Sequence, residues 1–239
     1  MNTKYLVISS ILNESSSSNS DLFNKIDLSK YERMYDSFDE GHNREHMTKV
    51  RNQAMILAEK YLPSKVHLVF IAATLHDIGL SVNRENHESI GANIVSKDPY
   101  FKTILSKSEI NEIVHAISQH RASSGKPKTI LAKIVSDADR SASTTSYTLY
   151  RAIAFGIIHD PGKTLDQYIE RAAKHHIEKF GKDGYGRRTY FKETEIRLNK
   201  IFNIIPKVYN EKGIKGIWNL LNNTHQNKIK KLLKQKRNA

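Results

Sequence analysis

The chain contains no cysteine. This excludes a disulfide framework, a thiolate nucleophile and any cysteine-based zinc or iron–sulfur site, so metal ligands have to come from histidine and carboxylate side chains. Long apolar runs are also absent, because the longest, Leu68–Leu75, is far shorter than the ~20 residues of a membrane-spanning helix. The apolar stretch Tyr5–Leu12 lacks a small-residue cleavage pattern. We therefore expect an intracellular, cytoplasmic protein with no signal peptide and no membrane span.

Positive charge, by contrast, is in excess. The 239 residues include 38 Lys and Arg against 25 Asp and Glu, a net charge of +13 with neutral histidines. Such an excess is either a solvated surface or an attraction for polyanions such as phosphorylated substrates, nucleic acid or acidic lipid. Composition does not separate these two interpretations. The apolar fraction of 38% is sufficient for a core of ordinary size.

Helical periodicity dominates the chain from Tyr31 onward, and no alternating, hairpin-like run is present. The pattern predicts an all-α fold with three regions: an N-terminal segment with a flexible Ser-rich linker (1–30), a main domain (31–210) and a basic C-terminal helical tail (211–239). Capping residues and breakers place the expected helices at residues 43–61, 64–78, 87–97, 108–121, 128–159, 165–180, 189–210 and 214–221.

The C-terminal tail is strongly basic, and residues 227–237 read NKIKKLLKQKR. It has too few apolar residues to insert deeply into a membrane. A frayed, solvated helix end is the favoured interpretation, and contact with nucleic acid is the alternative.

Four acid and imidazole side chains lie on apolar helical faces, where a surface pattern would not place them. They are His46, His76, Asp77 and Asp139. Asp139 is preferred to Asp137 for a buried role, because Asp137 shares its face with polar residues. Any one of the four is more simply explained as a hydrogen-bonded core residue or a helix-end cap. All four together favour a divalent cation, because burying two carboxylates and two imidazoles is costly without compensating charge.

The order of the motifs resembles the HD superfamily of metal-dependent phosphohydrolases. The matching segments are HNREHMTKV, FIAATLHDIGL, HESIGANIV, IVHAISQHR and KIVSDADR. In this resemblance His46 corresponds to the first histidine of the family, His76 and Asp77 to its His-Asp doublet, and Asp139 to its closing aspartate. The resemblance extends over roughly residues 31–210 and implies an all-α HD-domain bundle with a metal site between helices. The implied cofactor is a divalent ion: Mn, Fe, Ni, Zn, Co or Mg.

Two further histidines also face inward, since His87 opens one apolar stripe and His120 closes another. In related HD proteins such histidines contact phosphate, relay protons or bind a second metal, and the spacing leaves these roles open. Cations within a few residues of the expected ligands are candidates for holding phosphoryl oxygens. These candidate substrate-binding residues are Lys49, Arg84, Arg121 and Arg140.

The resemblance implies a phosphohydrolase that cleaves a phosphoester or phosphoanhydride with metal-activated water. The expected substrate is a small phosphorylated compound, most plausibly a nucleotide. One alternative is an HD-fold regulatory or nucleic-acid-binding module without turnover, and a lesser one is a two-iron oxygenase. The oligomeric state stays open at this point.

Overall fold

The computed structural model describes residue 23 and residues 25–181 and 184–237. These residues form helices joined by loops, with no strand among them, which confirms the all-α prediction. The expected Ser-rich linker, the segment NESSSSNS at residues 13–20, lies outside the described residues. Packing divides the chain into two units, one running to Ala142 apart from Asp39–Gly41, and the other comprising Asp39–Gly41 and the residues from Ser143 onward.

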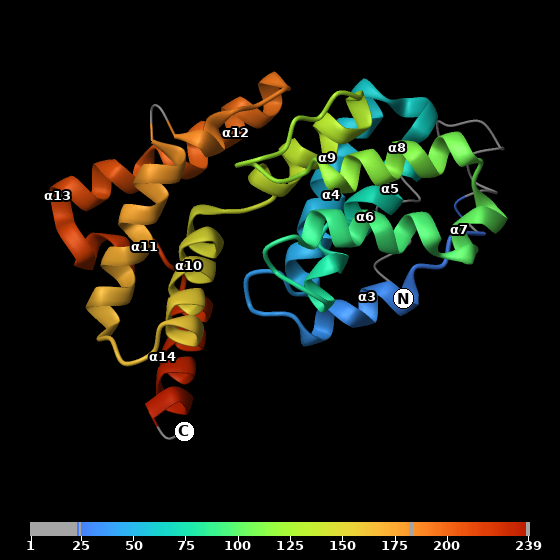
Figure 1. The fold of residues 1–239 in the computed structure, drawn as a ribbon. Coiled ribbons are helices and arrows are strands. Elements are labelled where there is room, and N and C mark those ends of the chain that lie inside the picture. The colour runs from blue at the N-terminus through green and yellow to red at the C-terminus, as the bar shows by residue number, and fades with distance from the viewer. Residues whose placement is uncertain (1–22, 24, 182–183, 238–239) are drawn as a thin grey trace. The chain divides into compact units, whose positions relative to one another are not determined.

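The first unit is built around a helix that is buried on all sides (Figure 1). All 10 residues of α5 (Val66–Leu75) are buried, because its sequence is apolar around the whole helical circumference. Helices α4, α8 and α9 pack against α5, and α6 packs against α8. The elements of this unit are α3 (Ser29–Met34), η1 (Tyr35–Ser37), α4 (Arg44–Tyr61), η2 (Pro63–Lys65), α5, η3 (Ile78–Ser81), α6 (His87–Lys97), α7 (Pro99–Ile104), α8 (Lys107–Ser118) and α9 (Ile130–Ser141).

The second unit has its own apolar core, in which Tyr147, Tyr150 and Tyr168 are almost fully buried. Helix α10 contacts both α11 and α14, and α11 contacts α13. The elements of this unit are α10 (Thr145–His159), α11 (Leu165–Phe180), η4 (Tyr185–Arg187), α12 (Lys192–Phe202), α13 (Ile204–Asn219) and α14 (Asn223–Arg237). Among the described residues, no helix is long and apolar enough to cross a membrane.

Several expected helix limits are wrong. The single helix expected over 128–159 is two helices, because Thr144 begins a new one by accepting a hydrogen bond from the Tyr147 amide. The helix expected over 189–210 is also divided, into α12 and the first part of α13. Helix α13 then continues into the range 214–221, where a separate short helix was expected, and it is kinked at Gly213 (φ 56°). The short helices α3 and α7 were not expected.

The C-terminal helix is not frayed. Ile229 of α14 is fully buried, and Leu232 and Leu233 pack partly buried against the core of the second unit. The few apolar residues of the tail are therefore enough to dock it, which corrects the favoured interpretation from the sequence. The limits expected for the main domain (31–210) and for the basic tail (211–239) stay predictions.

Candidate metal centre

His46 begins the site from the first turn of α4. The side chain of Asn43 caps this helix by accepting hydrogen bonds from the Glu45 and His46 amides, at 3.0 and 3.2 Å. The apolar face that follows, which includes Val50 and Ala54, is buried against the core of the unit. His46 lies on this face and is only 1% exposed, as its position in the helical pattern predicted.

His76 and Asp77 follow directly after α5 and are buried with it. The Nδ1–H of His76 donates to the Ala73 carbonyl at 2.8 Å, so Nε2 is the ring nitrogen that is turned toward the cluster. The hydroxyl of the buried Tyr35 accepts from the Asp77 amide at 3.3 Å and donates to the Thr74 carbonyl at 2.8 Å. Tyr35 is not among the residues expected from the sequence, where its only signal is the four-residue spacing from Tyr31, which is also buried.

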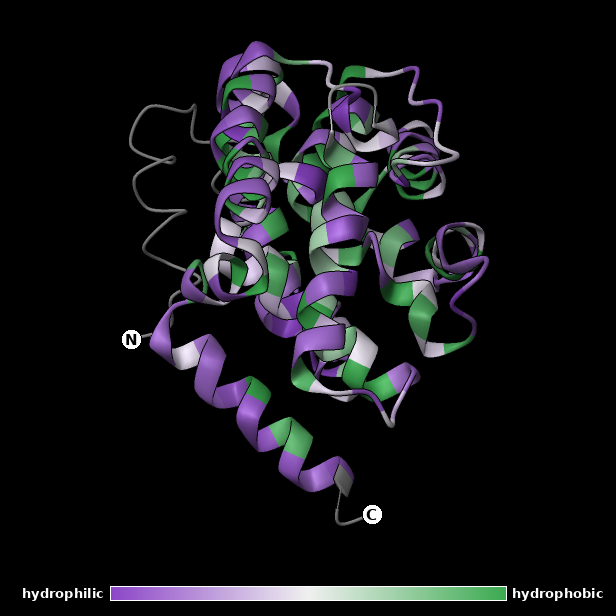
Figure 2. Cartoon of the chain, turned by 90° about the vertical axis from the view of Figure 1, so that its left-hand side faces the viewer, coloured by the Kyte–Doolittle hydropathy of each residue, from purple (hydrophilic) through white to green (hydrophobic). Residues whose placement is uncertain are grey.

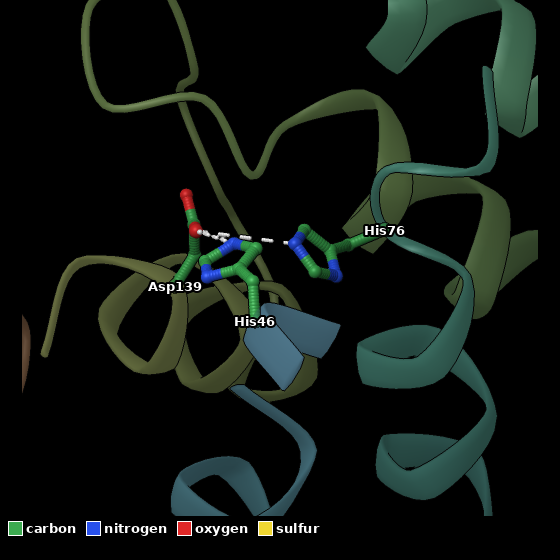
Figure 3. Close-up of side chains that lie close together, drawn as sticks. All are labelled: His46, His76 and Asp139. Atoms are coloured by element: carbon green, nitrogen blue, oxygen red, sulfur yellow. Dashed lines mark ion pairs between the residues drawn. The ribbon is translucent and has the colours of Figure 1, made fainter. Parts of the chain in front are cut away.

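The first cluster brings together His46, His76 and Asp139 (Figure 3), which offer ligand atoms within 4.8 Å of one another. Oδ1 of Asp139 lies 3.1 Å from Nε2 of His46 and 3.9 Å from Nε2 of His76. The three residues come from α4, the end of α5 and α9, so the cluster lies between helices, as predicted. Any bound ion here would join elements that are distant in the chain.

The burial predicted for α9 is wrong in one respect. Asp137, which was expected on a polar face, is fully buried, whereas the Asp139 side chain is 24% exposed. Asp137 is buried because it pairs at 2.6 Å with Arg140, whose side chain is itself only 2% exposed. Asp139 is nevertheless the aspartate of α9 that reaches His46, so the predicted residue does join the cluster. The expectation that it would be the more buried of the two aspartates is wrong.

A second cluster consists of Asp77, His87 and His120. Oδ1 of Asp77 lies 3.4 Å from Nε2 of each histidine, and the two Nε2 atoms are 3.3 Å apart. Both rings donate Nδ1–H to a backbone carbonyl three residues earlier, His87 to Arg84 at 2.8 Å and His120 to Ile117 at 2.7 Å. Their Nε2 atoms are therefore directed toward the same carboxylate oxygen.

Glycine is required where the second cluster is assembled. A Cβ atom added to Gly79 would lie 2.0 Å from the His87 carbonyl oxygen and 2.7 Å from the Gly91 amide. Only a glycine lets η3 approach the start of α6 this closely. The approach places His87 beside Asp77.

The electrostatics of the clusters favour charged carboxylates. Burial opposes ionisation of Asp77, but the charge of His76 and a hydrogen bond from His120 hold the pKa of its carboxyl well below its usual range. Burial also opposes ionisation of Asp139, and the hydrogen bond from His46 lowers the pKa of that carboxyl. For His76, burial favours the neutral ring, yet the neighbouring Asp77 carboxylate raises its pKa above the ordinary value.

These residues fit a cation. Nε2 of His76 and Oδ2 of Asp77 are buried, lie 3.1 Å apart and make no hydrogen bond within the described part of the chain. The nitrogen and oxygen donors, without sulfur, suit zinc, manganese, iron, nickel or cobalt. A divalent ion would satisfy both atoms and offset the two carboxylate charges.

The four cations expected to contact substrate are placed very differently. Arg140 is buried in its pair with Asp137, which disfavours a role at the surface of the site. Arg121 donates to the Glu85 carbonyl at 2.7 Å with a side chain that is 40% exposed. Lys49 pairs with Glu45 at 2.7 Å, one turn along α4 from that residue, and Arg84 is exposed in the loop before α6. Lys49, Arg84 and Arg121 therefore remain candidates.

Comparison with known proteins agrees with this geometry. Residues 43–144 match the HD domain family. A stretch of 71 residues is 41% identical to a protein described as Ribonuclease Y from Lawsonia intracellularis (strain PHE/MN1-00), and it covers 28% of this chain and 12% of that relative. No solved structure matches the chain. The chain therefore contains an HD domain over residues 43–144, and both buried His/Asp clusters lie within it.

Proposed function

We propose that the chain is a metal-dependent phosphohydrolase that cleaves a phosphoester or phosphoanhydride in a small phosphorylated compound. The observation that carries this function is the convergence of two buried His/Asp triads within the HD domain. A bound divalent ion lowers the pKa of a coordinated water and offsets the charge of phosphoryl oxygens. The chain supplies the ligands, their orientation and the burial that strengthens each charge interaction.

His46, His76, Asp77 and Asp139 would hold the first ion. Asp77 is the pivotal ligand, because its two oxygens face different triads. Oδ2 lies 3.1 Å from Nε2 of His76, whereas Oδ1 faces His87 and His120 at 3.4 Å each. If two ions are bound, Asp77 would be a ligand to both.

His87 and His120 have two candidate roles. They either contact the phosphoryl group and relay protons, or they hold a second ion with Asp77. Their two Nε2 atoms and Oδ1 of Asp77 lie within 3.4 Å of one another. Three possible ligand atoms this close together support the second ion, and the number of ions bound per chain distinguishes the roles.

A nucleotide is the substrate class that we propose first, and it suits the intracellular location expected from the sequence. Arg121, Arg84 and Lys49 would contact its phosphates from the surface of the first unit. The description of the relative as a ribonuclease adds the phosphodiester bond of RNA to the compounds worth testing. An HD-fold module without turnover and a two-iron oxygenase remain the alternatives from other functional classes.

The test is a screen of nucleotides, other phosphoesters and RNA with protein that has been stripped of metal and reloaded with each candidate ion. Metal-dependent phosphate or nucleotide release supports the hydrolase. No release with any ion would refute it, and the spectrum of a two-iron centre would favour the oxygenase instead.

The matched variants are Asp77→Ala and Asp36→Asn, a surface carboxylate of the same unit whose side chain is 57% exposed. We expect Asp77→Ala to lose both metal and activity, while Asp36→Asn keeps both. A metal-loaded, fully active Asp77→Ala protein would contradict the assigned site. Elemental analysis of the parent protein gives two ions per chain if both triads bind metal, and one if His87 and His120 act on the phosphate.

A further inference from the structure

The net charge of the chain is concentrated in its C-terminal part. Residues 143–239 hold 20 of the 38 Lys and Arg but only 8 of the 25 Asp and Glu, and so carry +12, whereas residues 1–142 carry +1. The part of the chain that contains the triads, residues 1–142, is therefore nearly neutral. If the positive charge served only to attract a phosphorylated substrate to the catalytic site, it would not need to be concentrated in residues 143–239.

Helix α14 carries the densest part of this charge. Asn223–Arg237 contains no Asp or Glu, so no carboxylate of the helix itself compensates its lysines. Lys230, Lys231 and Lys234 are exposed and occupy neighbouring positions at three- and four-residue spacing, on the side opposite the buried Ile229. We call these three lysines the basic face of α14. In Figure 2 the helix that ends at the C-terminus is mostly hydrophilic, with few hydrophobic segments.

The apolar side of α14 is already occupied within its own unit. Ile229 is fully buried, and Leu232 and Leu233 pack against the core. At the start of the helix, His225 stacks on Tyr150 with ring centroids 4.8 Å apart and an angle of 8° between the rings. Its Nδ1 also lies 2.6 Å from the Ser146 hydroxyl. The helix is thus fixed to α10 through its apolar side and presents its lysines outward.

This arrangement discriminates between two classes of polyanion. A helix that lies on a membrane has to bury its apolar face among the lipids, and the apolar face of α14 is not available for that. Nucleic acid needs only a row of exposed cations near its phosphates, because counterion release supplies most of the affinity. We infer that the basic face of α14 binds the phosphate backbone of a nucleic-acid strand without reading its sequence. This inference goes beyond the proposed hydrolase and holds whether or not the HD domain turns over substrate.

The test uses the full chain and fluorescence anisotropy with labelled single-stranded RNA of two unrelated sequences. Lys230→Gln/Lys231→Gln/Lys234→Gln removes the basic face. If each lysine neutralises one phosphate, the slope of log affinity against log salt between about 50 and 200 mM falls by about 2. Binding at about 0.1 M salt then weakens by up to about 100-fold. Both sequences should be affected equally.

The control variant removes three exposed lysines from the nearly neutral residues 1–142. They are Lys97, Lys102 and Lys107. This variant loses the same total charge, so an equal loss of binding in both triple variants would overturn the assignment to α14. Lys230→Arg/Lys231→Arg/Lys234→Arg keeps the charge and should bind like the parent protein, so a loss confined to the Gln variant is due to the lost charge.

Vesicles of phosphatidylserine and phosphatidylcholine provide the competing surface. Binding to RNA that is lost in the Gln variant, with no comparable binding to vesicles, supports the nucleic-acid surface. Binding to vesicles but not to RNA, or RNA binding that does not depend on salt, would overturn it. The Gln variant should bind Mn²⁺ like the parent protein, because its three substitutions lie outside residues 43–144, so a failure of the hydrolase and a failure of this surface are distinguished.

Discussion

Tyr35 contacts the backbone beside Asp77, and removal of its hydroxyl tests whether this contact positions the Asp77 carboxylate. The side chain is fully buried, and the hydroxyl joins the Thr74 carbonyl to the Asp77 amide. Burial and the nearby Asp77 carboxylate raise the pKa of Tyr35 well above its usual value, so the hydroxyl keeps its proton and donates to Thr74. Tyr35→Phe removes this bridge with little change in shape.

The expected cost follows from the two backbone groups that lose their partner. A buried polar group left unsatisfied costs about 1 to 3 kcal/mol, and the contact to the Asp77 amide, at 3.3 Å, belongs near the lower end of that range. We therefore expect Tyr35→Phe to lower the free energy of unfolding by about 2 to 4 kcal/mol. Because the bridge also fixes the backbone of Asp77, metal affinity should fall by about 10- to 100-fold.

Urea unfolding followed by circular dichroism measures the first effect, and calorimetric titration with Mn²⁺ measures the second. Tyr31→Phe is the matched control, since it removes a hydroxyl that bonds to Asp98, away from the triads. The control should lose about 1 kcal/mol and keep the metal affinity of the parent protein. If Tyr35→Phe keeps both the unfolding midpoint and the Mn²⁺ affinity, the bridge does not position Asp77 and the reasoning fails.

Three further substitutions test buried contacts in the two units. Asp137→Asn leaves the buried Arg140 guanidinium without this carboxylate and should cost about 3 to 5 kcal/mol in urea unfolding; a change below about 1 kcal/mol would show that the pair is not buried in solution. Gly79→Ala should lower the melting temperature, because its Cβ would lie 2.0 Å from the His87 carbonyl oxygen, and an unchanged melting temperature would contradict that close approach. Burial lowers the pKa of His176 from 6.5 to about 3, so the unfolded chain binds the proton first and stability is lost as the pH falls below 6.5. Urea unfolding should show a loss of about 2 kcal/mol between about pH 7 and pH 5 that His176→Phe abolishes, and an equal loss in that variant would assign the effect to other groups.

The sequence predicts the helical fold well but not where its helices divide. Apolar spacing is a property of each helix, and it identified the stripes that hold His46 and His76. The break between α9 and α10 contains neither glycine nor proline. It depends on Thr144, whose side chain caps the new helix, and serine and threonine occur too often inside helices for this signal to be decisive.

The site shows the same limit. Residue spacing placed Asp139 on the inner face of α9, but the structure buries Asp137 instead, because its pairing with Arg140 makes that burial possible. A helical pattern gives the direction of a side chain and not the partner that it meets. Asp77 places one oxygen near His76 and the other near His87 and His120, and these distances depend on how separate helices pack, so they could not be read from the order of residues.

Three histidines orient their rings in the same way, each by a hydrogen bond to the carbonyl three residues earlier. The orientation of each ring is therefore determined within a segment of four residues. The distance of the ring from the other possible ligands depends instead on how whole helices pack. A substitution far from the site that shifts one helix would change the spacing of the donors without rotating them. If the domain binds a metal, an ion that demands a strict geometry should be affected by such a shift more than a permissive one. Helix packing would then influence which ion is bound, whereas the local turns would keep each donor atom directed toward it.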